Sequence, residues 1–241
     1  MPQFLIDSSA IKDGVATITG SDAKHITTVL RLRCGDWLMI TDGKGNKWRA
    51  ELISASPKAV KVKLAILPSY HLAISPIILA QAMIKHDRFE WMIQKAVELG
   101  CSQIVPFISE RTIPKFHAAK FVRWQKIADE AAKQCGTLIH PKIEQPIAFF
   151  ELIKQLKPFE QKILFYEGEN KNSLNTLTLK PLNTVLIIGP EGGFTNAEVA
   201  AARQTDIVTY SLGPLILRVE TASIAALVLT QYKLGYFNKT T

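Results

Sequence analysis

The stretch Thr184-Val-Leu-Ile-Ile-Gly-Pro-Glu-Gly-Gly-Phe-Thr195 decides how the fold of this 241-residue chain is interpreted. Val185–Ile188 is a short β-rich run, typical of a strand that is buried on both faces. Gly189-Pro190 breaks this run, and Gly192-Gly193 allows a positive φ or a close approach of backbone. The stretch therefore predicts a strand that runs into a glycine-rich turn.

A helix is expected next, and the whole pattern then repeats. Thr195 and Glu198 have the spacing of a capping box, which predicts a helix through Arg203. Ile207–Leu212 reads as a second strand and Gly213-Pro214 as a second turn. Two such units place bare backbone amides and carbonyls at the carboxyl end of a sheet, where a small ligand binds.

The second unit continues with Leu212-Gly-Pro-Leu-Ile-Leu-Arg-Val-Glu-Thr-Ala222. Thr221 is the expected N-cap of an apolar helix from Ala222 to about Leu234, and Gly235 ends it. We expect the two loops to close on one cofactor.

The loops restrict the chemistry of that cofactor. Neither G-x-x-x-x-G-K-[ST] nor G-x-G-x-x-G is present. Glu191 would repel a polyphosphate that approaches the helix N-terminus. A neutral or locally cationic ligand fits better, and the sulfonium of S-adenosylmethionine is compatible with these residues.

Two domains are predicted, residues 1–72 and residues 73–241, joined by a link at Pro68–Pro76. The first contains short β-rich segments separated by turn signals and one expected helix at Ser21–Arg31, which favours a small β-barrel. Its expected strands are 14–19, 37–41, 47–54 and 59–67. The second alternates expected strands (77–83, 104–108, 162–166) with amphipathic helices (89–97, 121–135, 149–156), which predicts an α/β domain with a parallel sheet.

Several motifs, in order, resemble one known family. Beside the two loops, these are Lys95-Ala-Val-Glu-Leu-Gly100, Ile104-Val-Pro106 and Ser109-Glu-Arg-Thr112, with His25-Ile-Thr-Thr-Val-Leu-Arg31 near the N-terminus. Together they are similar to the RsmE-type 16S rRNA uridine-N3 methyltransferases of the SPOUT superfamily. The similarity runs from about residue 4 to 236.

The resemblance implies a SPOUT-type α/β domain with a trefoil knot, preceded by a PUA-like β-barrel that binds RNA. It also implies S-adenosylmethionine as cofactor, 16S rRNA in the small ribosomal subunit as partner, and a homodimer. Two alternatives stay open, namely another RNA acceptor such as a ribose 2′-oxygen of rRNA or tRNA, and a non-catalytic RNA-binding assembly factor.

Site residues follow from the loops and the resemblance together. Arg218 and Glu220 are the expected catalytic residues, placed on one face if their segment is extended. Their alternative is a local ion pair that stabilises the turn. Tyr166-Glu167-Gly168 is a weaker candidate. The expected cofactor-binding residues are Gly189, Pro190, Glu191, Gly192, Leu212, Gly213, Leu215, Ile216, Leu217 and Ala222, and the expected RNA-binding residues are His25, Arg31, Arg33 and Arg111.

Two positions depart from the family pattern. Lys133-Gln-Cys-Gly-Thr137 stands where the family has Glu-Gln-x-x-Arg, and Pro214 replaces a residue that is usually charged or polar.

Composition is consistent with an RNA partner. The net charge is +8, and cations for phosphates accompany aromatic rings that can stack. Trp37 and Trp48 are interleaved in the sequence with Lys24, Arg31, Arg33, Lys44, Lys47 and Arg49. The alternative is a solvated strand face with core tryptophans. Three scattered cysteines and the absence of a signal-peptide pattern favour reduced thiols in the cytoplasm, and scattered histidines indicate no metal site.

Overall fold

The computed structural model describes residues 1–43, 45–66, 77–113, 119–137 and 139–237. The chain forms two compact units, Met1–Leu72 with Ala132–His140, and Ala73–Ala131 with Pro141–Thr241. The predicted link at Pro68–Pro76, and Leu67 of the last predicted barrel strand, lie outside the described residues. The N-terminal unit is therefore built from two separate parts of the sequence, and the second part includes the last residues of helix α3 (Ala119–Cys135).

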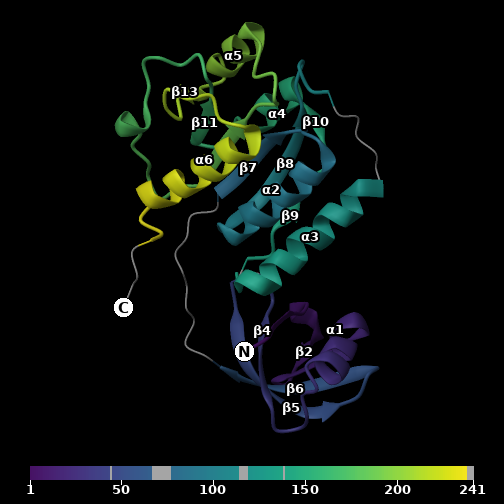
Figure 1. The fold of residues 1–241 in the computed structure, drawn as a ribbon. Helices are drawn as coiled ribbons and strands as arrows, with labels where there is room; N and C mark the ends of the chain where they lie inside the picture. The colour runs from purple at the N-terminus through teal and green to yellow at the C-terminus, as the bar shows by residue number, and fades with distance from the viewer. Residues whose placement is uncertain (44, 67–76, 114–118, 138, 238–241) are drawn as a thin grey trace. The chain divides into compact units, whose positions relative to one another are not determined.

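The N-terminal unit is a curled six-stranded sheet, drawn in purple and blue in Figure 1. Strands β1 and β4 run parallel, and the other neighbours are antiparallel. Alternate residues such as Leu38, Ile40 and Val62 fill its core. The sheet order is β1 (Gln3–Leu5), β4 (Trp37–Thr41), β5 (Lys47–Ala55), β6 (Ala59–Ile66), β3 (Val15–Thr19) and β2 (Ile11–Lys12).

The helix expected at Ser21–Arg31 is shorter and less regular than predicted. It consists of α1 (Gly20–Lys24) and one π-helical turn (His25–Val29). The Thr27 and Thr28 hydroxyls bond back to the carbonyls of Ala23 and Lys24, at 2.9 and 2.5 Å, which competes with regular helical bonding. Arg31 has a φ of 55°, so the helix ends before it.

The C-terminal unit contains a seven-stranded sheet in which every pairing is parallel, as predicted. Strands β7, β8, β11, β12 and β13 agree with the expected segments to within a few residues, whereas the short strands β9 and β10 were not predicted. Every residue of the central strands β7 and β12 is buried. The order is β10 (Ile147–Ala148), β8 (Cys101–Ile108), β7 (Ile77–Ala82), β12 (Thr184–Ile188), β11 (Gln161–Phe165) and β13 (Val208–Tyr210), while β9 (Lys142–Ile143) also pairs with β8.

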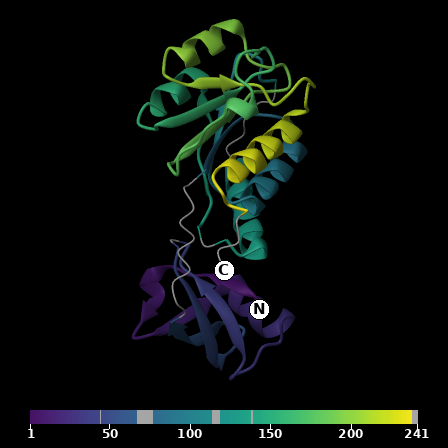
Figure 2. The same cartoon turned by 90° about the vertical axis from the view of Figure 1, so that its left-hand side faces the viewer.

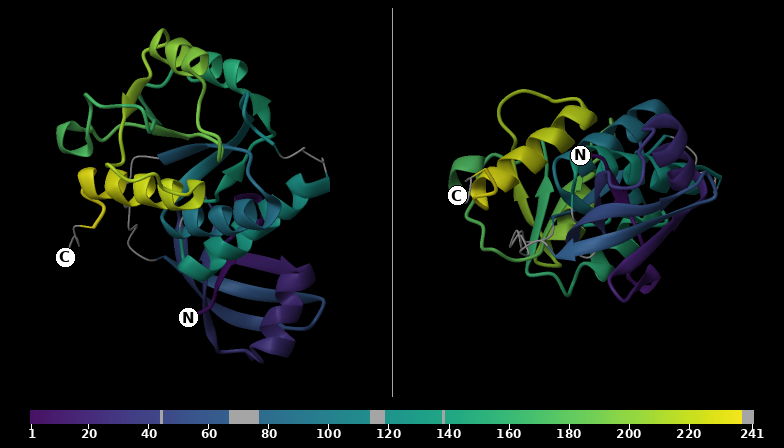
Figure 3. Two further views of the ribbon diagram at one scale, coloured as in Figure 1. Left: turned by 45° about the horizontal axis from the view of Figure 1, so that its top comes forward. Right: turned by 90° about the horizontal axis from the view of Figure 1, so that it is seen from below.

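Helices cover both faces of this sheet, which explains its continuous apolar strands. Helices α2 (His86–Glu98) and α6 (Val219–Lys233) lie side by side on one face (Figures 1 and 2). Helices α4 (Phe149–Gln155) and α5 (Asn196–Arg203) pack on the other, toward the top of Figure 3, left. No helix among the described residues is long and apolar enough to cross a membrane.

Alternation along β7 shows how the two faces differ. Ala80 and Ala82 join the apolar cluster under α4 and α5. Gln81 points the other way, where its Oε1 lies 2.5 Å from Ser223 Oγ on α6. The start of α6 is thus held against a central strand of the sheet.

Candidate functional site

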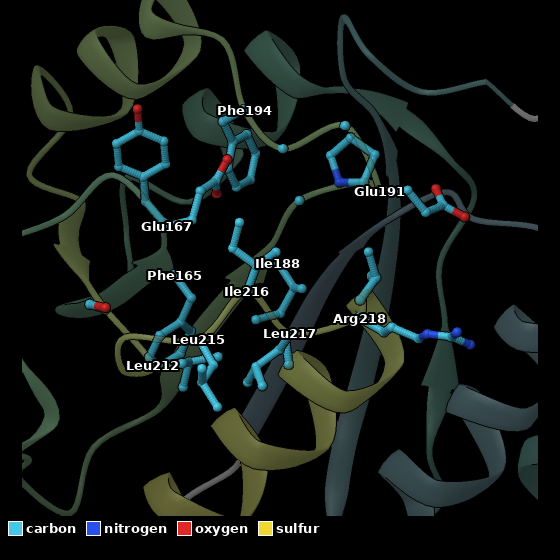
Figure 4. Close-up of a pocket in the computed structure, with 18 of the residues that line it drawn as sticks. Phe165, Glu167, Ile188, Glu191, Phe194, Leu212, Leu215, Ile216, Leu217 and Arg218 are labelled. Atoms are coloured by element: carbon cyan, nitrogen blue, oxygen red, sulfur yellow. The ribbon is translucent and has the colours of Figure 1, made fainter.

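A cavity of about 450 Å³ lies at the carboxyl ends of β11, β12 and β13 (Figure 4). Its wall is made by the ends of these strands and the segments that follow them, residues 165–167, 188–194, 211–213 and 215–219, together with Arg88 and Ala222. The volume falls within the range of small-molecule sites, about 300–1,000 Å³. The carboxyl edge of a parallel sheet is also where such sites form.

Both predicted loops contribute to this one cavity. Every residue expected to bind the cofactor, from Gly189 in the first loop to Ala222 in α6, is part of its lining. The sequence motifs therefore come together in space although the strand and helix between them separate them in sequence.

The first loop needs its glycines. A Cβ at Gly189 would meet the Phe194 ring at 2.9 Å, and a Cβ at Gly193 would collide with the Glu167 carboxylate. Gly193 also has a φ of 67°. The capping box predicted at Thr195 and Glu198 is present and starts α5 directly after the loop. The Glu167 carboxylate thus lies closer to the backbone of Gly193 than any residue with a Cβ would allow.

The second loop offers apolar contact instead. Leu215 and Ile216 are 76% and 90% exposed, although both border the cavity. Figure 4 shows Leu212 and Leu215 gathered near Phe165. Gly213 has a φ of 124°, which favours glycine, and the Ser211 hydroxyl and backbone of Gly213 hydrogen-bond to each other. The exposed leucine and isoleucine are placed to cover the apolar part of a ligand.

The expected arrangement of Arg218 and Glu220 is wrong in one respect. Helix α6 begins at Val219 with Arg218 as its N-cap, not at Ala222 with Thr221 as N-cap, and the Ala222 N–H donates to the Arg218 carbonyl at 2.8 Å. Arg218 itself is extended, but Val219 and Glu220 are helical, so the segment is not a continuous extended strand. Arg218 is exposed, borders the cavity and points to the side toward which Glu191 also extends in Figure 4.

Glu220 does not pair with Arg218. Its Oε1 lies 3.7 Å from Nη1 of Arg88 on α2. Its other carboxylate oxygen is buried and has no hydrogen-bond partner among the described residues. Glu220 stands behind the cavity wall, whereas Arg88 and Arg218 are part of it.

Sequence reasoning missed Arg88. It occupies the first turn of α2, where the helix dipole disfavours a cation, and this unfavourable position was the available signal. The weaker candidate Tyr166-Glu167-Gly168 is placed at the site, since Tyr166 and Glu167 both border the cavity.

Two models of known families match the chain. One, described as an RNA methyltransferase domain, matches residues 72–231, and another, described as an RNA methyltransferase PUA domain, matches residues 18–65. The chain belongs to the RNA methyltransferase family. The trefoil knot implied by the resemblance stays a prediction.

Known proteins are similar to this RNA methyltransferase over almost its whole length. The ribosomal RNA small subunit methyltransferase E of Bacillus subtilis is 31% identical over 229 residues, 90% of each chain. The crystal structure of the protein of that name from Neisseria gonorrhoeae, bound to S-adenosyl methionine, matches with a TM-score of 0.86 and 28% identity. It covers 96% of this chain and 97% of the other. A putative methyltransferase from Legionella pneumophila, in complex with the same cofactor, gives a TM-score of 0.84 at 29% identity, over 95% and 96% of the two chains.

Three of the predicted RNA-binding residues lie in the segment matched by the PUA model. His25, Arg31 and Arg33 are all exposed, and the His25 ring meets Phe4 edge-on at 6.0 Å. The positive φ of Arg31 is uncommon for a residue other than glycine. Such a conformation is often kept at functional positions.

Trp37 and Trp48 of the same unit differ in which interpretation of the sequence they fit, an RNA-binding surface or a core position. The exposed Arg49 stacks over the half-buried Trp37, with 4.4 Å from its guanidinium carbon to the ring centroid. Trp48 packs against the core instead. Only Trp37 thus forms the expected cationic and aromatic surface.

Arg111 lies in the C-terminal unit of the RNA methyltransferase. Its Nη1 donates to the Gly192 carbonyl at 2.8 Å, so the residue contacts the first cofactor loop. No group of three or more potential metal ligands occurs among the described residues.

Proposed function

We propose that this chain is an S-adenosylmethionine-dependent methyltransferase that modifies N3 of a uridine in the 16S rRNA of the small ribosomal subunit. The observation that carries the proposal is the glycine-lined cavity at the carboxyl edge of the sheet, built by both loop motifs. The relative from Neisseria gonorrhoeae, which matches the fold at a TM-score of 0.86, binds S-adenosyl methionine.

The residues of the cavity fit this cofactor. Its wall combines backbone at Gly189, Gly192 and Gly213 with exposed apolar side chains at Leu215 and Ile216. Backbone carbonyls and amides can hold the adenine and ribose, and the leucine and isoleucine can pack on their faces. When bound, S-adenosylmethionine supplies an electrophilic methyl group on its sulfonium.

The chain's own residues would position the acceptor. The uridine must lose its N3 proton, to water or to a base, while the methyl group passes from the sulfonium sulfur to N3, so stabilisation of the developing uracil anion favours the reaction. We assign that role to the exposed guanidinium of Arg218, by contact with a uracil oxygen or an adjacent phosphate. Glu220 would orient Arg88, which lines the cavity and whose Nη1 lies 3.7 Å from Oε1 of Glu220.

RNA recognition is assigned to the N-terminal unit, through His25, Arg31 and Arg33. Their exposure leaves two cationic side chains and one imidazole available for phosphates and unstacked bases. We also propose a homodimer in the cytoplasm, as the resemblance to SPOUT enzymes implies.

A methyl-transfer assay tests the function. Small ribosomal subunits from cells that lack this protein would be incubated with the purified chain and S-adenosylmethionine labelled with tritium on the methyl group. Nucleoside digestion followed by mass spectrometry then identifies the acceptor. The expected product is 3-methyluridine, formed on the subunit and absent when the chain is omitted.

Other outcomes separate the alternatives. Label on a ribose 2′-oxygen would retain the cofactor and replace the acceptor. No label, together with no cofactor binding in calorimetry, would contradict an enzymatic function and leave a protein that only binds RNA.

A further inference from the structure

Glu198 is the most completely buried carboxylate next to the first cofactor loop. It is 0% exposed and lies in the first turn of α5. One oxygen, Oε2, accepts the Thr195 N–H at 2.9 Å, as in an ordinary capping box. The other oxygen, Oε1, accepts the N–H of Glu110 at 2.9 Å, from the turn that follows β8. A capping box requires only the first bond, so the second needs another explanation.

Further contacts join the same two segments. The Thr195 Oγ1 lies 3.1 Å from Oε2 of Glu110. Arg111 donates from Nη1 to the Gly192 carbonyl at 2.8 Å. A Cβ at Gly192 would approach Cβ of Arg111 to 3.2 Å, so the loop rests closely on the arginine stem. The turn and the loop are therefore linked at both ends of the loop segment 192–195.

The turn itself is well fixed. The Ser109 N–H donates to Thr112 Oγ1 at 2.9 Å, and the Thr112 N–H donates to the Ser109 carbonyl at 3.1 Å. Because β8 pairs with β7 in the middle of the sheet, the turn after β8 is held in place relative to the sheet. The loop that is bonded to this turn is held in place with it.

These bonds hold one peptide group of the cofactor loop on both sides. The Gly192 carbonyl accepts from Arg111, and the N–H of the same peptide, on Gly193, donates to the Pro190 carbonyl at 2.9 Å. With both groups engaged, this peptide cannot rotate freely. The backbone after Gly192, beside a residue that borders the cavity, is therefore held in one orientation.

We propose that Glu198 and Arg111 are positioning residues that fasten the first cofactor loop to the turn after β8, so that the cofactor pocket is formed before a ligand enters. A loop ordered in advance loses less conformational entropy on binding, which strengthens affinity. The inference rests on the proposed function for the identity of the ligand. It also assigns Arg111 a role in supporting the loop that lines the pocket, in place of direct contact with RNA.

The experiment compares Glu198→Gln and Arg111→Ala with the wild-type chain. Calorimetry measures the Kd for S-adenosylmethionine, and hydrogen exchange without cofactor measures the protection of residues 189–195. We expect the Kd to rise about 10- to 100-fold in both variants, because a small displacement of a positioning group has effects of that size. Exchange in the loop should accelerate, while kcat at saturating cofactor falls much less than the affinity.

Glu169→Gln is the matched control. Glu169 is also a buried carboxylate of the same unit, bonded to Arg203, Thr209 and the Lys171 N–H, but it does not border the cofactor cavity. Its substitution removes a comparable network and should leave the Kd and the exchange of residues 189–195 at their wild-type values. Equal loosening of the loop in this control would mean that general destabilisation is responsible, and would overturn the proposal.

Other outcomes are equally decisive. Wild-type affinity and wild-type loop exchange in both test variants would overturn the positioning role. If Arg111→Ala weakens binding of 16S rRNA fragments but leaves loop exchange unchanged, Arg111 is an RNA contact instead. If Glu198→Gln does not fold, Arg111→Ala still tests the proposal, because Arg111 is exposed and its substitution should leave the fold intact. If the wild-type chain does not bind S-adenosylmethionine, the proposed function fails, whereas loop exchange without cofactor still decides whether the two residues hold the loop.

Discussion

Glu169 is a carboxylate whose surroundings favour its ionised form. The hydrogen bond from the Thr209 hydroxyl, followed by that from the Lys171 N–H, lowers its pKa from 4.5 to about 2. Because this folded-state pKa lies below the unfolded value, the stabilisation is complete above about pH 4.5 and is lost as the pH falls toward 2. Glu169 therefore stabilises the folded chain at neutral pH, and the loss of this contribution in acid favours acid unfolding.

The corresponding prediction concerns Glu169→Gln. The variant should unfold at lower urea concentration than wild type at pH 7, and the difference should shrink as the pH falls below 4.5. Urea titrations at several pH values between 7 and 3, followed by circular dichroism, measure both curves. A difference that stays constant over this range would show that the pKa of Glu169 is not lowered in the folded chain.

Arg218 is predicted to act in the reaction rather than in folding. It is the N-cap of α6, but its side chain makes no capping hydrogen bond, and it is exposed at the cavity. Arg218→Ala should therefore retain the urea midpoint and lose activity by about 10²–10³-fold, typical for removal of one group that stabilises developing negative charge. The methyl-transfer assay and circular dichroism together measure this.

Arg123→Ala provides the control for Arg218. Arg123 is an exposed arginine of the same unit, paired with Glu90 at 2.7 Å and remote in sequence from both loops. Exposed ion pairs contribute little, so this variant should keep both stability and activity. Normal turnover by Arg218→Ala would contradict the catalytic assignment.

At the scale of the elements, one buried polar contact fixes α6 to the sheet. Ser223 and Gln81 are both 0% exposed, and the glutamine amide also donates from Nε2 to the Ala82 carbonyl at 3.1 Å. Ser223→Ala leaves the Gln81 oxygen without its donor, and a buried unsatisfied group costs about 1–3 kcal/mol. The helix that begins with Arg218 would then be less firmly held.

We therefore expect Ser223→Ala to lower the free energy of unfolding by that amount and to reduce kcat as well. Urea unfolding and the methyl-transfer assay provide the two readouts. Thr176→Ala, which removes an exposed hydroxyl bonded to the Ser173 carbonyl, is the control with expected wild-type behaviour. Unchanged stability in Ser223→Ala would mean that the contact does not hold α6.

Local patterns predicted most of the elements, because their causes are local. Apolar runs and the capping box placed β12 and α5 to within a residue. The short strands β9 and β10 have no such pattern, since each exists only through pairing with β8. The start of α6 was misplaced because Thr221 is a favourable N-cap by type, yet the first helical hydrogen bond already forms from Ala222 to Arg218.

The candidate site, too, could be predicted from the sequence only where its features depend on local residues. Glycines in both loops are visible in the sequence, because a Cβ at Gly193 would collide with the Glu167 carboxylate and the φ of 124° at Gly213 favours glycine. The bonds of Glu198 to Glu110 and of Arg88 to Glu220 join residues far apart in sequence. Such contacts depend on how helices pack on the sheet, which no local pattern specifies.

At the scale of the whole chain, the charge of +8 predicts how binding to RNA responds to salt. Each contact between a cation and a phosphate releases counterions, so log Kobs falls with log salt by about 0.7–0.9 per contact. The cofactor site is lined largely by backbone and apolar side chains, and its affinity should change little over the same salt range. Raising the salt concentration should therefore weaken the binding of RNA and leave the binding of S-adenosylmethionine almost unchanged.

Arg31 and Arg33 allow this prediction to be assigned to the N-terminal unit. Both are exposed, so Arg31→Gln combined with Arg33→Gln should keep the fold and make the salt slope shallower by about 1.5, if each contacts one phosphate. The matched pair Lys154→Gln and Lys157→Gln removes the same charge from exposed positions at the end of α4 and just beyond it. Filter binding of a 16S rRNA fragment at several salt concentrations measures the three slopes. Equal loss of slope in both double variants would show that the RNA responds to total charge alone, whereas loss confined to the arginine pair places phosphate contacts on the N-terminal unit.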